Sequence, residues 1–144
     1  MTVGFSGAGF DIDLREGQKR EDALAYVLRL AKVELKCDRM CRQTGNVFVE
    51  LQQKGRWSGL ATTESEFWAF EIDDQCWLIV PTAVLRDIVR LIWRENRARG
   101  RKAMVSGGDF NRYKGVLVPI ARLVYLFNAV RGGYPRVAAE GGRQ

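Results

Sequence analysis

The chain contains no histidine, and this absence removes a large part of the usual catalytic chemistry. Mechanisms that pair a serine or cysteine nucleophile with a histidine base are excluded within the chain. Proton transfer must instead use carboxylates, lysines, tyrosines or water bound to a metal ion. A zinc site is also disfavoured, because the chain has only three cysteines and a fourth ligand would have to be a carboxylate.

Cysteines and long apolar runs are scarce as well. Cys37, Cys41 and Cys76 are an odd number of thiols in a chain long enough to bury a core without cross-links, which indicates free thiols in a reducing compartment. The longest apolar runs, near 76–81 and 123–127, are too short to span a bilayer. No secretory signal is recognisable at the start. We therefore expect a cytoplasmic protein that makes no contact with a membrane.

Positive charge is what the chain has in excess. Lysine and arginine number 23 against 17 acidic residues, which gives a formal net charge of +6 and a pI of about 9.5. This balance favours an acidic partner such as nucleic acid. The length of 144 residues suits a single domain spanning 1–144, with loose ends expected at 1–9 and 131–144.

Hydrophobic periodicity predicts an α/β fold of the α+β kind, with a central mixed sheet flanked by helices. A turn at Gly17 and a short helix carrying Phe67 and Trp68 are also expected. Strands 32–38 and 46–52 are expected to pair as an antiparallel hairpin, because only seven residues separate them. The remaining helices are predicted at 18–31, 83–96 and 119–127, and the remaining strands at 70–72, 76–80, 104–106 and 115–118.

The strand 32–38 carries the candidate chemistry. Its alternation places Glu34, Lys36 and Asp38 on one face, and the expected hairpin sets Glu34 opposite Glu50. Like charges opposite each other destabilise a ladder unless a divalent cation binds between them. Lys36 would then lie beside the cation, where it can hold an attacking water or neutralise a phosphate. An ordinary strand with solvated charges shows the same alternation.

The motifs around this strand resemble those of a group of small phage proteins described as PD-(D/E)XK or Holliday-junction-resolvase-like nucleases. The resemblance extends over roughly residues 10–125. It implies a restriction-endonuclease-like fold and a nuclease that hydrolyses DNA with Mg²⁺ or Mn²⁺. It also implies DNA as partner, a possible homodimer and, for a phage protein, the host cytoplasm. The central motifs are Lys-Val-Glu-Leu-Lys-Cys-Asp (32–38), Thr-Gly-Asn-Val-Phe-Val-Glu (44–50) and Ser-Gly-Leu-Ala-Thr-Thr-Glu (58–64), the last followed by Phe67-Trp68. Phe-Asp-Ile-Asp-Leu-Arg-Glu-Gly (10–17) precedes them, and Ser-Gly-Gly-Asp-Phe-Asn (106–111) followed by Val-Leu-Val-Pro (116–119) comes after them.

Carried onto this chain, the resemblance matches Glu34 and Lys36 to the Glu-x-Lys element of the family. Glu21 matches the glutamate that resolvase-like members carry on a helix before the site. The sequence departs from the family where an aspartate should precede Glu-x-Lys on its own strand, and Pro-Asp is absent.

A second assignment takes Asp38 as the family's aspartate and Glu50-x-Gln52 as the Glu-x-Lys element, with glutamine in place of lysine. Asp11 and Asp13 are a third source of the missing carboxylate. These alternatives remain open at this point. The candidate catalytic residues are Glu34, Lys36, Glu50, Asp38 and Glu21, of which Glu34, Glu50 and Asp38 are the candidate metal ligands.

Candidate contacts to nucleic acid are basic. Lys54 and Arg56 adjoin Trp57, a mixture typical of nucleic-acid contact and equally of a solvated hairpin end. A basic run at 86–102 predicts phosphate contact, although its first arginines also suit a solvated helix face. This run contains Arg86, Arg90, Arg94, Arg97, Arg99, Arg101 and Lys102.

Two other functions fit the same sequence. The incomplete motif also suits a catalytically inactive module that binds nucleic acid or a host protein on the same fold. An interaction protein whose basic charge only keeps it in solution is the third possibility.

Overall fold

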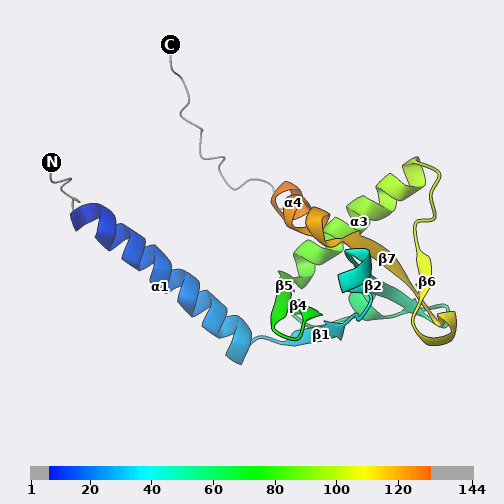
Figure 1. Cartoon of the computed structure of the whole chain (residues 1–144), viewed down its shortest axis with the longest axis horizontal. Helices are drawn as coiled ribbons and strands as arrows, with labels where there is room; N and C mark the ends of the chain where they lie inside the picture. Colours follow the sequence, from blue (N-terminus) through cyan, green and yellow to red (C-terminus); the bar gives the residue numbers. More distant parts are fainter. Residues whose placement is uncertain (1–6, 131–144) are drawn as a thin grey trace, which may run out of the picture.

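The structure is a computed structural model that describes residues 7–130 (Figure 1). Helices and strands alternate irregularly along this part of the chain. The helices are α1 (Gly7–Arg29), α2 (Cys41–Thr44), α3 (Thr82–Ala98) and α4 (Ile120–Val130), with single turns η1 (Gly59–Ala61) and η2 (Asp109–Asn111). The strands are β1 (Val33–Cys37), β2 (Asn46–Gln53), β3 (Arg56–Trp57), β4 (Phe67–Asp73), β5 (Cys76–Pro81), β6 (Val105–Gly107) and β7 (Tyr113–Pro119).

The described strands form two sheets. The first has the order β1-β4-β5 and is mixed, because β1 runs parallel to β4 while β5 runs antiparallel to it. The second has the order β3-β2-β7-β6 and is antiparallel throughout. The expected α+β architecture with a mixed sheet is therefore confirmed. Its likeness to a restriction endonuclease stays a prediction.

One long helix joins the two sheets into a common core. The buried face of α3 carries Leu85, Ile88 and Ile92, and it packs against strands of both sheets and against α4. Burying a side chain of this size stabilises the fold by roughly 1.5–3 kcal/mol. Figure 1 shows α1 extending away from this core. None of the helices described here has the length and apolar composition needed to cross a membrane.

The expected hairpin between the first two strands is wrong. Residues of β1 pair with β4, so that Glu34 lies beside Trp68, whereas Glu50 of β2 lies beside Gly115. The residues between β1 and β2 form α2 instead of a hairpin loop, and Cys41 of α2 is buried in the core. The two strands joined by this connection belong to different sheets.

Several local predictions are also wrong. Phe67 and Trp68 lie in β4 and not on a helix. The helical turn before them, η1, ends at Ala61. Gly17 lies inside α1, which begins at Gly7 and so includes three residues of the segment expected to be loose. The expected loose tail 131–144 lies outside the described residues. The predictions for β5, α3, β6, β7 and α4 are confirmed to within a few residues.

Candidate functional site

Strand β1 turns its charged side chains toward the interior. Val33 and Leu35 are 40% and 55% exposed, whereas the side chains of Glu34 and Lys36 are only 25% and 31% exposed. The cause is the pairing with β4, which places the two charged residues on the same face as the buried Trp68 and Phe70. An ordinary amphipathic strand would point its charges outward. The interpretation of this face as a solvated one therefore does not fit.

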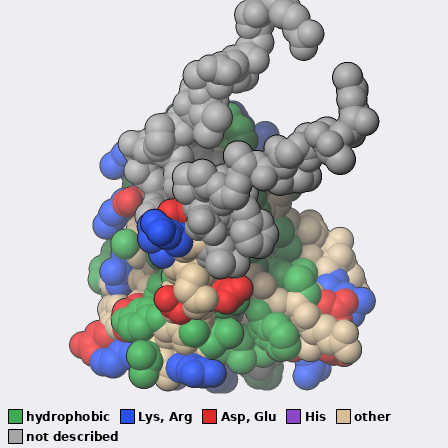
Figure 2. Space-filling view, turned by 90° about the vertical axis from the view of Figure 1, so that its left-hand side faces the viewer, with side chains coloured by type: hydrophobic (Ala, Val, Ile, Leu, Met, Phe, Trp, Pro, Cys, Tyr) green, Lys and Arg blue, Asp and Glu red, His purple; other side chains and the backbone are tan. Residues whose placement is uncertain are grey.

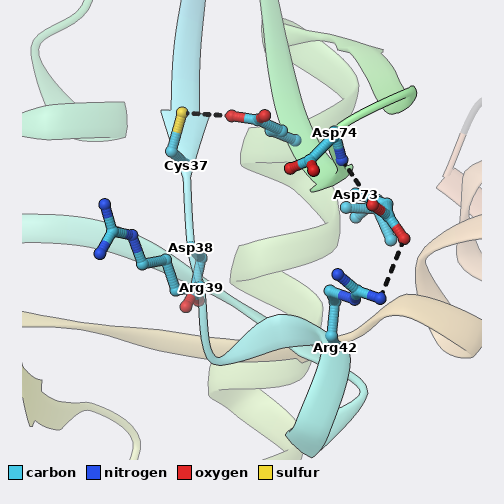
Figure 3. Close-up of a pocket in the computed structure, with 8 residues that line it drawn as sticks. Cys37, Asp38, Arg39, Arg42, Asp73 and Asp74 are labelled. Atoms are coloured by element: carbon cyan, nitrogen blue, oxygen red, sulfur yellow. Dashed lines mark hydrogen bonds and ion pairs between the residues drawn. The ribbon is translucent and has the colours of Figure 1, made fainter.

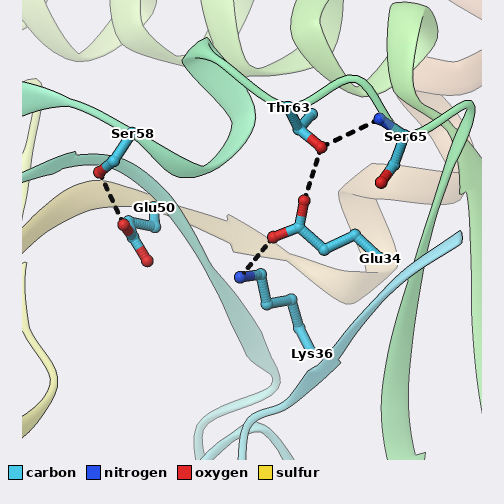
Figure 4. A network of polar contacts seen from close by, with 6 residues as sticks. All are labelled: Glu34, Lys36, Glu50, Ser58, Thr63 and Ser65. Atoms are coloured by element: carbon cyan, nitrogen blue, oxygen red, sulfur yellow. Dashed lines mark hydrogen bonds and ion pairs between the residues drawn. The ribbon is translucent and has the colours of Figure 1, made fainter.

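Glu34 and Lys36 form a tight ion pair held by two further contacts (Figure 4). Lys36 Nζ lies 2.6 Å from Glu34 Oε1, and the Thr63 hydroxyl donates to Glu34 Oε2 at 2.7 Å. Lys36 Nζ also lies 5.0 Å from the centre of the Trp68 ring. Burial raises the pKa of Glu34, but the hydrogen bonds and charge of its partners outweigh it and leave that pKa below its ordinary value. The carboxylate is therefore ionised at neutral pH.

Glu50 approaches the same region from the second sheet. Its carboxylate accepts a hydrogen bond from the Ser58 hydroxyl at 2.7 Å (Figure 4). Two glycines fit closely around its backbone, because a Cβ at Gly59 would lie within 3.0 Å of the Glu50 carbonyl and one at Gly115 within 3.0 Å of the Val49 carbonyl. This close fit fixes the place of Glu50 on β2.

Lys36, Asp38 and Glu50 line one pocket of about 420 Å³ between the two sheets, which we call the inter-sheet pocket. Both Asp38 oxygens accept backbone hydrogen bonds, Oδ1 from Met40 at 2.9 Å and Oδ2 from Phe48 at 3.2 Å. Asp38 thus ties the end of β1 to β2. Each carboxylate oxygen has a second lone pair, so Asp38 keeps the capacity to bind a cation.

The described residues hold no group of three or more acidic or cysteine side chains that could hold a metal ion by themselves. Of the predicted ligands, Asp38 and Glu50 share the inter-sheet pocket, and Glu34 lies behind Lys36. Glu21 is exposed on α1 and lies outside the pocket lining. Asp11 and Asp13 fall where side chains are not described. The structure therefore brings together two of the candidate carboxylates and the lysine.

Gln52 is part of the alternative hypothesis that takes Glu50-x-Gln52 as the Glu-x-Lys element. The ladder between β2 and β7 has an irregularity between Glu50 and Gln52. Strict alternation is lost there, so the two side chains need not share a face.

The predicted basic contacts have different surroundings. Arg86 donates to the carbonyls of Leu60 and Thr63 at 3.1 and 2.9 Å, and so holds the loop that carries Thr63. Arg90 pairs with Asp87, and Arg97 lies over the Trp93 ring. The remaining predicted contacts are exposed: Arg94, Arg99, Arg101, Lys102, Lys54 and Arg56.

Sequence reasoning missed the residues that support the site. Ser58, Thr63 and Trp68 contact Glu50, Glu34 and Lys36, respectively. Ser58 and Thr63 both fall within the segment 58–64 that carried part of the resemblance, and this was the one available signal. Trp68 belongs to the Phe67-Trp68 pair that follows this segment in the resemblance, but its position beside β1 depends on a long-range pairing that the sequence did not indicate.

A second polar pocket, of about 490 Å³, lies at the end of β1 (Figure 3). Two contacts join groups of its lining: Arg42 forms an ion pair with Asp73 at 3.2 Å, and the Cys37 thiol donates to Glu71 at 2.6 Å. The hydrogen bond to Glu71 raises the pKa of Cys37, which keeps this residue a thiol and a weak nucleophile. The contacts form a local network at the end of β1.

Comparisons of the chain with protein-family models, curated proteins and solved structures find no match.

The lowered pKa of Glu34 predicts a specific acid sensitivity. A carboxyl group whose pKa is lowered by folding stabilises the protein at pH values above its ordinary pKa, here 4.5. This stabilisation is lost as the pH falls through the pKa that the group has in the folded protein. The variant Glu34→Gln is expected to be less stable than the wild type at pH 7, and the difference is expected to shrink below pH 4.5. Urea unfolding at several pH values measures it. A difference that stays constant with pH would contradict the role assigned to the ion pair.

Proposed function

We propose that the protein is a metal-dependent endonuclease that hydrolyses DNA phosphodiester bonds at the inter-sheet pocket. The observation that carries the proposal is the inward-facing Glu34–Lys36 pair of β1 beside a pocket with two further carboxylates. Keeping charged side chains partly buried costs free energy, which a purely structural strand face would avoid. Partly buried charges around an open pocket are characteristic of functional sites.

The pocket suits Mg²⁺ or Mn²⁺ in its donor chemistry. Mg²⁺ usually takes one or two protein carboxylates and completes its shell with water and substrate phosphate. Asp38 and Glu50 would supply those two. A bound divalent cation would polarise a phosphoryl oxygen and make a water molecule a stronger nucleophile.

Lys36 would act on the phosphate. Its ammonium carries three N–H donors, and the ion pair with Glu34 leaves donors free for a phosphate oxygen. Glu34 holds the ammonium in place, and Thr63 in turn holds Glu34. The lysine would thus neutralise charge that develops on the phosphate during attack.

DNA would be held by the positive charge of the chain. The net charge of +6 attracts a polyanion. Exposed basic residues lie on α3, just after its end, and at the turn between β2 and β3. Such contacts position the backbone without reading sequence.

The proposal is tested by combining a cleavage assay with metal titration. Nicking of supercoiled plasmid is expected with Mg²⁺ or Mn²⁺ and not with excess EDTA. Calorimetric titration of Mn²⁺ is expected to show weak binding to the protein alone and stronger binding once a short DNA is added, because two carboxylates leave the remaining ligands to phosphate and water. If the protein retains DNA but forms no product in either metal, the nuclease proposal fails.

A binding module without catalysis is the second candidate. The observation that favours it is the lack of a group of three metal ligands among the side chains that the structure describes. This candidate requires DNA retention that weakens steeply with salt, with no cleavage in any metal.

A host-protein-binding role has its own support on the surface. Large apolar side chains are exposed on α1 and β1, among them Leu28 at 66% and Leu35 at 55%. Hydrophobic side chains also gather along the lower part of the face in Figure 2. Exposed apolar patches are typical of surfaces that bind another protein. Capture of a host protein that Leu35→Ser abolishes would support this role.

A further inference from the structure

A third pocket, on the opposite side of β2 from the inter-sheet pocket, is lined by aromatic, aliphatic and arginine side chains. It lies between the segment β3–η1 and helix α3 and has a volume of about 340 Å³. Two indole rings, Trp57 and Trp93, belong to its lining, and Leu60 adds aliphatic surface. We call it the tryptophan groove. None of these residues takes part in the inter-sheet pocket.

Trp57 is available for contact. It lies on the two-residue edge strand β3 and is 64% exposed. Exposing an indole of this size to water is unfavourable, and stacking against a second flat ring would relieve it. Trp93 on the other side of the groove already carries the Arg97 guanidinium at 5.0 Å from its ring centre. The groove thus offers an accessible flat surface.

The charges of the tryptophan groove have one sign. Its two charged lining residues are Arg86 and Arg90, of which Arg90 forms an ion pair with Asp87 at 2.9 Å. Arg86 donates its hydrogen bonds to neutral backbone carbonyls, and no carboxylate pairs with it in the described contacts. Arg56, next to Trp57, is also exposed. A flat apolar floor with a positive rim is complementary to a planar base attached to a phosphate backbone.

The chain links this groove directly to the inter-sheet pocket. Trp57 lines the groove, and the next residue, Ser58, donates to Glu50. Arg86 lines the groove and binds the Thr63 carbonyl, while the Thr63 hydroxyl donates to Glu34. A strand seated in the groove would therefore lie against elements that also position the proposed catalytic residues.

We propose that the tryptophan groove binds an unpaired base, so that the substrate is DNA with a single-stranded segment. This inference rests on the proposed function. In a duplex both faces of a base are covered by its neighbours, and only an unpaired base can place a face on Trp57. The groove would thus distinguish DNA that contains an unpaired segment from continuous duplex.

The test compares Trp57→Ala with Trp77→Ala. Trp77 is a matched control, because it is also exposed, at 52%, but lies on β5 outside the groove. Fluorescence anisotropy measures the affinity of each protein for a labelled single-stranded oligonucleotide and for the same sequence as duplex.

Trp57→Ala is expected to weaken single-strand binding by about tenfold, the effect of losing one stacked base. Its duplex affinity is expected to change at least fivefold less, by about twofold. Trp77→Ala is expected to match the wild type, and Trp57→Phe to restore most of the loss.

The outcomes separate this inference from the proposed function. If Trp57→Ala loses no more single-strand affinity than Trp77→Ala, or loses duplex affinity equally, the groove does not bind an unpaired base. That result leaves cleavage at the inter-sheet pocket untouched. If the wild type binds neither form of DNA at low salt, the proposed function fails together with the groove. Loss of single-strand affinity confined to Trp57→Ala, with plasmid nicking absent, supports the groove and the non-catalytic module.

Discussion

Replacing Glu50 by glutamine is expected to lower metal-dependent DNA cleavage by about 100-fold or more, the lower range for loss of a group that acts directly in the chemistry. Glutamine keeps the size of the side chain, and its carbonyl oxygen can still accept the hydrogen bond from Ser58. It loses the negative charge, which is what a hard divalent cation requires. The fold is therefore expected to persist while the reaction stops. Initial rates of plasmid nicking at saturating Mn²⁺, with thermal unfolding of the same samples, measure both effects.

Lys36→Met provides the companion test. Methionine keeps an apolar stem against Trp68 but carries no ammonium, so the phosphate loses its cation. The double variant with Glu50→Gln is expected to be no slower than the slower single variant, because residues that act as one unit are not additive. Glu64→Gln is the matched control, since Glu64 is exposed and lines none of the pockets described above. Equal rates for Glu50→Gln and Glu64→Gln would place the chemistry elsewhere.

The sequence identified the residues of the candidate site better than it identified their partners. Alternation in 32–38 correctly placed Glu34 and Lys36 on one face, because the period of a strand is a local property. Which face of the strand turns toward the interior is not a local property of the sequence. It follows from the parallel pairing with β4, whose Trp68 and Phe70 lie more than 30 residues further along the chain.

The same limit explains the predicted hairpin. Neighbouring strands with a short link usually pair with each other, and this rule favoured a ladder between 32–38 and 46–52. Nothing local revealed that Cys41 would be buried and turn the link into α2. Glu50 still reached the pocket of Lys36, although through a sheet-to-sheet approach and not across a ladder. The long amphipathic helix α3 was predicted well, since its apolar stripe repeats over several turns.

Gly115→Ala is expected to destabilise the protein by about 2–3 kcal/mol, within the range for overpacking a core. Gly115 lies beside Glu50 in the ladder between β2 and β7 and is buried. A Cβ there would lie within 3.0 Å of the Val49 carbonyl and of the Phe48 ring. The carbonyl belongs to the backbone of the neighbouring strand, so it cannot move aside without shifting β2. Urea unfolding of the wild type and the variant measures the loss.

The shift would also reach the site, because Val49 directly precedes Glu50 and Phe48 lines the inter-sheet pocket. Gly115→Ala should therefore lower cleavage even under conditions where the variant is fully folded. Gly17→Ala is the control: a Cβ at Gly17 meets no atom within 4 Å, and alanine favours a helix over glycine by about 1 kcal/mol. If Gly115→Ala is as stable and as active as Gly17→Ala, the close packing of β7 against β2 does not set the position of Glu50. If stability falls while cleavage per folded molecule is unchanged, Glu50 is not held by this contact, and Ser58 and Gly59 remain as the groups that place it.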